Sequence, residues 1–242
     1  MSSITAAEIR ASDLGTPPAT TPEFENAVGA AVSGNLAAFG ASVSDQHRQD
    51  VVQSLLFAQL VAGGKADRYK DPVNWYSAYQ TALQQLAWII QASSTTGRYL
   101  SPTPSFTVGS VVSDLLRPRV SSTELALVTN ALNAYRGDAS GLAQLVFECP
   151  SHAGGLGNFQ FALVTEDEED NGTVVLRIVQ VSFNAPQHVT RLMTEAFTST
   201  AQFQTGFVAM TLNENTFDSL RSSLTKRLEP WFASMVVPLQ LP

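Results

Sequence analysis

The chain has 242 residues, of which 44% are hydrophobic and only 14% are charged, and its formal net charge is −7. A chain of this length can bury the core of one large domain. The negative charge argues against nucleic acid as a partner, because phosphate binding requires clustered Lys and Arg.

The single cysteine, Cys149, rules out an internal disulfide and any metal site built from several cysteines. The N-terminal residues show no basic segment followed by an apolar one, and no apolar run approaches the ~18 residues of a membrane-spanning helix. We therefore expect a cytoplasmic protein, or one exported by a route that needs no signal sequence.

Helical periodicity dominates the first half of the chain. Residues 1–22 are rich in proline and threonine and predict a flexible tail and linker, and a single α+β domain is expected over 23–242. The helical half of this domain, 23–137, repeats apolar residues at the helical period. Helices are predicted over 23–40, 44–62, 71–91, 105–116 and 121–135.

Segment 27–44 contains no charged residue and is rich in Gly, Ala and Ser. Its pairs Gly29/Ser33 and Ala30/Gly34 have the spacing that lets two helices approach closely. Such a helix could leave the domain and enter a bilayer or a partner bundle. The alternative is a helix packed tightly on the core.

The helix predicted over 71–91 carries no charge after Asp71. Trp75 and Tyr79 fall on a broad apolar face, and Trp88 falls in the middle of the opposite, polar face. A charge buried without a partner costs several kcal/mol, so an uncharged helix is typical of one surrounded by protein. Trp75, Tyr79 and Trp88 are the candidate ligand- or partner-binding residues.

Strand patterns replace helical ones after Gly141. Residues with β-branched and aromatic side chains predict strands over 142–149, 158–165, 173–183, 188–200 and 203–212. A last helix is predicted over 214–228. The expected fold is therefore α+β: an N-terminal helical layer packs on a C-terminal antiparallel meander, the sheet half 141–212, and a terminal helix follows.

The central helix contains the pattern D-x-x-N-W-Y-x-x-Y, followed by Leu and by W-x-x-Q. With a later L-N-x-x-x-[FY] motif, it resembles an uncharacterised family of bacterial and fungal proteins in which a helical half precedes a strand-rich half. The resemblance covers roughly residues 45–230 and implies the same fold, but it implies no activity and no catalytic residue. The residues that carry it are Asp71, Asn74, Trp75, Tyr76, Tyr79, Leu86, Trp88, Gln91, Leu212, Asn213 and Phe217.

Cys149 and His152 are a nucleophile and a base that lie close in sequence, in the stretch C-P-S-H. They could form a reactive thiolate pair, or Cys149 could be acylated. Nothing in the sequence supplies a third, orienting group, and a cysteine at the end of an apolar strand is commonly inert packing. Catalysis by this pair is the weaker interpretation.

No metal site and no cofactor are expected. The acidic run 166–172 places Asp167, Glu169 and Asn171 at calcium-loop spacing, but Ile178 stands where such a loop requires a bidentate Glu. A solvated hairpin tip is the favoured interpretation. The three histidines are too far apart in sequence to form a zinc motif.

Three functional hypotheses follow. The leading one is a non-enzymatic binding or effector protein, with a toxin-like role included, whose helical half engages a membrane or a protein partner. The second is a carrier that holds an apolar small ligand between the helical layer and the sheet. The third is a hydrolase or acyltransferase that depends on Cys149 and His152.

Overall fold

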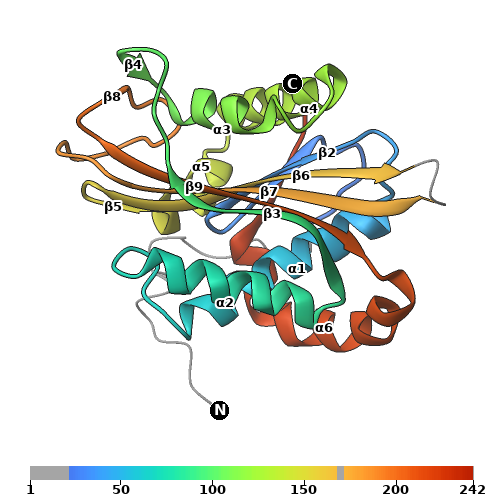
Figure 1. Ribbon diagram of the computed structural model, residues 1–242. Coiled ribbons are helices and arrows are strands. Elements are labelled where there is room, and N and C mark those ends of the chain that lie inside the picture. The colour runs from blue at the N-terminus through green and yellow to red at the C-terminus, as the bar shows by residue number, and fades with distance from the viewer. Residues whose placement is uncertain (1–21, 168–171, 242) are drawn as a thin grey trace.

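The computed structural model describes residues 22–167 and 172–241. The predicted N-terminal tail, up to residue 21, and the tip of the acidic loop, with Glu169 and Asn171, lie outside the described residues. Within them, a β-sheet is covered by helices on both faces (Figure 1). The α+β class predicted from the sequence is confirmed.

The main sheet runs in the order β10-β1-β2-β6-β7-β9-β3, and β5 pairs with β6. β2 and β6 are parallel, and the other neighbours are antiparallel. A short second sheet joins β4 to β8. The strands are β1 (Gly29–Val32), β2 (Asn35–Phe39), β3 (Trp88–Arg98), β4 (Ser105–Phe106), β5 (His152–Ala153), β6 (Leu156–Asp167), β7 (Thr173–Asn184), β8 (Phe197–Thr198), β9 (Gln202–Leu212) and β10 (Val236–Leu239).

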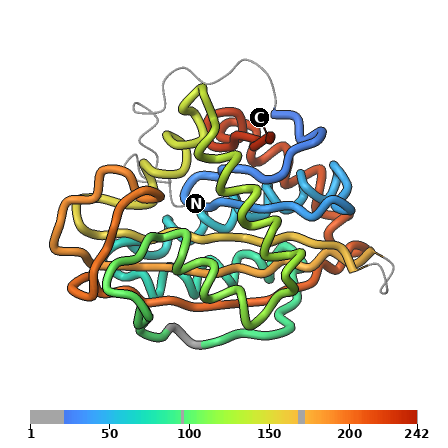
Figure 2. Tube along the Cα trace, turned by 90° about the horizontal axis from the view of Figure 1, so that it is seen from above, coloured from blue at the N-terminus to red at the C-terminus, as the bar shows by residue number. Residues whose placement is uncertain are grey.

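The helices form one layer on each face of the sheet. They are α1 (Asp45–Gly63), α2 (Pro72–Gln85), α3 (Val108–Leu116), α4 (Ser122–Gly137), α5 (Leu142–Ser151) and α6 (Glu214–Met235). One apolar core lies between the sheet and α1, α2 and α6, and the other lies between the sheet and α3, α4 and α5. Viewed from above, α4 lies across β1, β2 and β6 (Figure 2).

Local signals placed several elements correctly. Ser44 caps α1 by accepting a hydrogen bond from the His47 backbone N–H at 3.2 Å, and the predicted capping box of Ser121 and Glu124 opens α4. β6, β7 and β9 contain the strands predicted there, and α6 continues past the predicted end to Met235. None of the helices in the described ranges combines the length and the apolarity needed to cross a bilayer.

The helix predicted over 23–40, and with it the mobile helix of segment 27–44, is wrong. The chain there forms the β1–β2 hairpin, turning at Ser33 (φ 49°). All nine strand residues are buried, because the hairpin lies inside a sheet that is covered on both faces. A strand of this kind shows no polar–apolar alternation, which is why its apolar residues were assigned to a helical period.

The strand predicted over 142–149 is the helix α5. Its buried residues are Ala143, Val146, Phe147 and Ser151, a helical spacing that outweighs the strand propensity of the individual side chains. The strand predicted over 188–200 reduces to β8, and the remainder is irregular. Both segments pack into the core beneath α3 and α4.

The helix predicted over 71–91 ends at Gln85. Ala87 has a φ of 67°, a left-handed conformation that ends the helix and redirects the chain into β3. Trp88 is therefore the first residue of β3, is 1% exposed and packs in the core beneath α1, α2 and α6. The position on a polar helix face predicted for Trp88 is wrong.

The hairpin assignment can be tested at Gly29. A Cβ on Gly29 would overlap the carbonyl oxygen of Ala37 on the neighbouring strand, so Gly29→Ala should lower the free energy of unfolding by about 1–3 kcal/mol. In a helix the same substitution would raise it by about 1 kcal/mol. Chemical denaturation distinguishes the two signs, and Gly137→Ala, at a glycine with open space around it, is the matched control.

Candidate functional site

A row of amide side chains crosses the centre of the sheet. Asn35 on β2 pairs with Gln160 on β6, which in turn pairs with Gln180 on β7. Each of the three is at most 1% exposed. Phe159 and Phe161, the neighbours of Gln160, point into the core beneath α3, α4 and α5, so the amide row faces the α1–α2–α6 layer. Polar groups at the centre of a covered sheet are costly unless they are hydrogen-bonded.

Aromatic rings of α2 lie over this row. The helix begins at Pro72, and Asp71 caps it by accepting a hydrogen bond from the backbone N–H of Asn74. The Tyr79 hydroxyl donates to Asn35 Oδ1 at 3.2 Å, and the Tyr79 ring stacks on the Trp75 ring at a centroid distance of 5.4 Å. Burial raises the pKa of Tyr79 far above its usual range, so this hydroxyl stays protonated.

Arg68, on the loop between α1 and α2, closes one end of the row. Its Nη2 donates to the carbonyl oxygen of Asn158 at 3.1 Å, and its guanidinium lies over the Trp75 ring at 4.7 Å from the centroid. The guanidinium also packs against Gly34, where a larger side chain would collide with it. Burial lowers the pKa of Arg68. Among the residues that the structure describes, no carboxylate forms an ion pair with Arg68.

Several polar atoms at this site are buried and have no hydrogen-bond partner within the described part of the chain. They are Arg68 Nε, Asn35 Nδ2, Gln160 Oε1 and Gln180 Oε1. Buried polar groups are normally hydrogen-bonded, and a cluster of exceptions requires water or a ligand to complete it. We refer to Arg68, Asn35, Asn158, Gln160 and Gln180 as the Arg68 patch.

The structure brings two of the three predicted aromatic residues to this patch. Trp75 and Tyr79 contact Arg68 and Asn35, as described above. Trp88 pairs with Leu212 on β9, six residues along that strand from Gly206, which pairs with Gln180. That separation is about 20 Å at the rise of a strand, so Trp88 does not belong to the site.

A second polar cluster joins α1 to α6. Asp50 is fully buried, and Arg221 contacts it with two parallel hydrogen bonds: Nε to Oδ1 and Nη2 to Oδ2, both at 2.9 Å. His47 Nδ1 lies 2.6 Å from Glu166, and His47 Nε2 lies 3.3 Å from Glu214. His47, Asp50 and Glu214 are close enough to share a metal ion, a grouping that sequence spacing did not reveal. Arg221, however, already neutralises both carboxylates.

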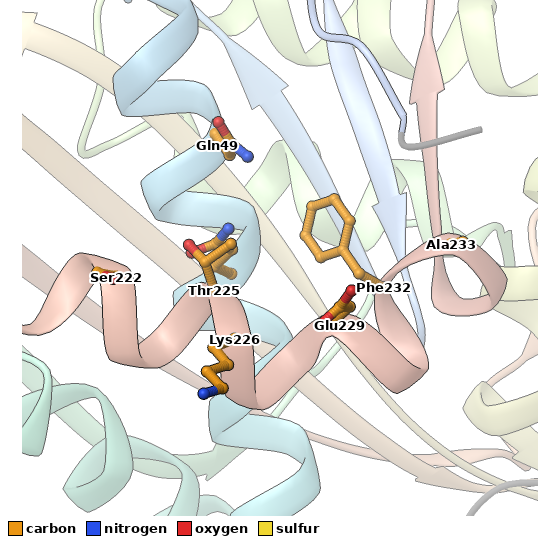
Figure 3. Close-up of a pocket in the computed structure, with 8 residues that line it drawn as sticks. Gln49, Ser222, Thr225, Lys226, Glu229, Phe232 and Ala233 are labelled. Atoms are coloured by element: carbon orange, nitrogen blue, oxygen red, sulfur yellow. The ribbon is translucent and has the colours of Figure 1, made fainter.

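A groove of about 470 Å³ runs between α1 and α6 beside this cluster (Figure 3). Thr225 on α6 donates a hydrogen bond to Gln53 on α1 across it at 3.1 Å. The lining of the groove mixes apolar, neutral polar and charged side chains and has no concentrated charge. The lining residues are Gln49, Gln53, Ser222, Thr225, Lys226, Glu229, Phe232 and Ala233.

Cys149 and His152 lie on the other face of the sheet. Cys149 is half-buried in the last turn of α5, and His152 follows in β5. Burial lowers the pKa of His152, and the neighbouring His188 lowers it further. A catalytic Cys–His pair needs a carboxylate or amide to orient the histidine. Within the described residues, the charged neighbour that acts on the pKa of His152 is another histidine.

Comparison with known proteins gives no family. No protein-family model matches the chain, and no curated protein matches it either. The solved structures that are similar to it include the following three. A chain described as delta-endotoxin has a TM-score of 0.39 and 9% identity, with 74% of this chain and 83% of that chain covered. The Evf virulence factor has a TM-score of 0.34 and 12% identity, with 87% and 84% covered.

The third is the activated Cyt2Ba monomer from Bacillus thuringiensis subsp. israelensis. It has a TM-score of 0.41 and 8% identity, with 74% of this chain and 95% of that chain covered. Of the three, one is described as an endotoxin and one as a virulence factor. All three TM-scores lie below 0.5, and the functional proposal below therefore rests on the site alone.

Removal of the charge should change the free energy of unfolding very differently at Arg221 and at Arg68. Arg221→Met leaves the buried Asp50 carboxylate without its guanidinium and should cost about 3–5 kcal/mol. Arg68→Met leaves no carboxylate behind, so the free energy of unfolding should stay within about 1 kcal/mol of the wild type or increase. Chemical denaturation of both variants measures the contrast. Equal losses would mean that the Arg68 charge is compensated in the folded protein.

The pH dependence of stability should contain a contribution from His152. Its pKa in the folded protein is below the usual 6.5, so the unfolded chain takes up a proton first as the pH falls. Stability is therefore lost on acidification below about pH 6.5, and His152→Gln should flatten this loss between about pH 7 and pH 5. Glu148, whose pKa burial raises, acts in the opposite direction in both proteins and cancels in the comparison. Parallel pH profiles for the two proteins would refute the assignment.

Proposed function

We propose that the protein is a non-enzymatic binding protein of the effector type, and that it holds a small polar ligand between α2 and the sheet at the Arg68 patch. One observation carries the proposal: a buried guanidinium without a carboxylate lies beside a row of buried amides with unpartnered atoms. A perturbed, incompletely bonded charge is typical of a binding site, and purely structural buried charges are normally paired.

The polarity of the site favours this function over the carrier of an apolar ligand. The carrier hypothesis places an apolar ligand between the helical layer and the sheet. At the Arg68 patch, this location is lined by amides and a guanidinium as well as by aromatic rings. An apolar molecule there would leave the amides unsatisfied, and each buried unsatisfied group costs about 1–3 kcal/mol. A polar ligand removes that cost on binding.

The wider effector role would use the outer surface of the same layer. The groove between α1 and α6 is open to solvent and mixed in character, which suits a protein partner better than a small apolar molecule. We therefore assign the engagement of a partner to α1 and α6, and the binding of a small ligand to α2 and the sheet.

Native mass spectrometry of the purified protein tests the small-ligand site. The wild type should carry a bound small molecule, and the variant Gln160→Leu/Gln180→Leu should lose it, because leucine fills the space of glutamine and cannot accept a hydrogen bond. Gln85→Leu, at an exposed position of α2, is the matched control and should retain the ligand.

A ligand retained by the double variant would place the binding site elsewhere. The double variant should lose no more than about 1–3 kcal/mol relative to the ligand-free wild type, because it removes one buried hydrogen bond, from Gln160 Nε2 to Asn158 Oδ1, whereas the two Oε1 atoms have no partner to lose. A large loss of stability would mean that the amides are structural.

A further inference from the structure

Arg68 and Arg221, two arginines of the α1–α2–α6 layer, can be compared directly. Arg221 uses the edge of its guanidinium that carries Nε and Nη2 to hold both oxygens of the Asp50 carboxylate. On Arg68 the same edge has one neutral acceptor, the Asn158 carbonyl oxygen on Nη2, and Nε is buried without a partner. The edge that holds a carboxylate in one arginine is thus incomplete in the other.

From this comparison we propose that Arg68 binds the carboxylate of a small organic acid that also carries a hydroxyl or amino group. The inference rests on the proposed function and names its ligand class. A guanidinium edge matches the two oxygens of a planar carboxylate, and the pairing is charge-assisted. Trp75 on one side and Gly34 on another fix the plane of the guanidinium, so the edge is oriented before the ligand arrives.

The orientation of the amide side chains indicates that the ligand also carries a hydroxyl or amino group. The Arg68 carbonyl oxygen can only accept, so Asn158 must present Nδ2 to it, at 2.7 Å. Asn158 Oδ1 then faces Gln160 and accepts from its Nε2 at 2.8 Å. Gln160 Oε1 is consequently turned away from Asn158 as an acceptor without a donor, and Gln180 Oε1 is a second one on the next strand. A ligand that satisfies them must donate.

Water fits these groups less well than an organic acid does. Ordered water can satisfy amide oxygens, but it cannot neutralise a buried guanidinium. Inorganic phosphate at neutral pH carries P–OH donors and can also pair with a guanidinium, so it is the competing anion in the test. Arg68 remains partly exposed as a residue, so a solute can reach it from solvent.

The test compares a hydroxy acid with its neutral amide. Lactate and lactamide, and the larger pair mandelate and mandelamide, are titrated into ligand-free wild-type protein by calorimetry, with inorganic phosphate as a third probe. At least one of the two acids should bind at least about tenfold more tightly than its neutral amide, because of the two only the acid completes the charged edge. Phosphate that binds as tightly as this acid would contradict a carboxylate site.

Variants assign the effect to Arg68. Arg68→Lys keeps the charge but loses the planar edge, and Arg68→Gln loses both, so each should weaken binding of the acid by about tenfold or more. Arg98→Gln, at an exposed arginine on β3, is the matched control and should bind as the wild type does. Circular dichroism and thermal melting establish that each variant is folded.

The outcomes separate this inference from the proposed function. If neither acid binds, or if an amide binds as well as its acid, the inference fails. If mass spectrometry also finds a neutral ligand that depends on Gln160 and Gln180, the proposed function still stands. If no ligand of any kind is found and no probe binds, water alone occupies the patch and both fail.

Discussion

Helices cover both faces of the sheet, so a polar side chain on an inner strand has no bulk water to bond and must find its partner inside the protein. Most inner-strand positions meet this constraint with apolar residues. At one place, amides occupy paired positions on β2, β6 and β7 instead. The polar groups above them are placed accordingly: the Tyr79 hydroxyl donates to Asn35, and Arg68 donates to the carbonyl oxygen of Asn158.

Arg221 and Arg68 meet this constraint in different ways. Arg221 meets Asp50 with full geometric complementarity, and the pair fastens α6 to α1. Arg68 meets only neutral groups, and burial lowers its pKa. A buried charge with neutral partners reduces stability. Residues that reduce stability and make no compensating structural contact are concentrated at functional sites.

Sequence reasoning found the elements whose signals are local. The capping residues of α1 and α4 lie within a few positions of the helices they begin, and β6 and β7 have strand patterns that a single pass can recognise. The β1–β2 hairpin was not predicted, because a strand buried on both faces shows no polar–apolar alternation. The helices that cover it come from distant parts of the chain. α5 escaped although its buried residues have helical spacing, because strand propensity was given more weight than periodicity.

The sequence predicted only part of the candidate site. Trp75 and Tyr79 belonged to a helix whose lack of charge was already informative, and both contact the Arg68 patch. Arg68 itself is 90 residues from Asn158, and no local pattern connects the two. The available signal was the pair of amides at Asn158 and Gln160, two residues apart on one face of an otherwise apolar strand. Polar residues at such positions predict a buried network, although not the partner that completes it.

The loop that carries Arg68 also connects the two sides of the molecule. Arg68 bonds to Asn158 on β6, and the hydroxyl of the adjacent Tyr69 donates to the carbonyl oxygen of Pro150 on α5 at 2.9 Å. Pro150 directly follows Cys149. The loop between α1 and α2 therefore holds both the Arg68 patch and the last turn of α5, and its position is fixed by hydrogen bonds on both sides of the sheet.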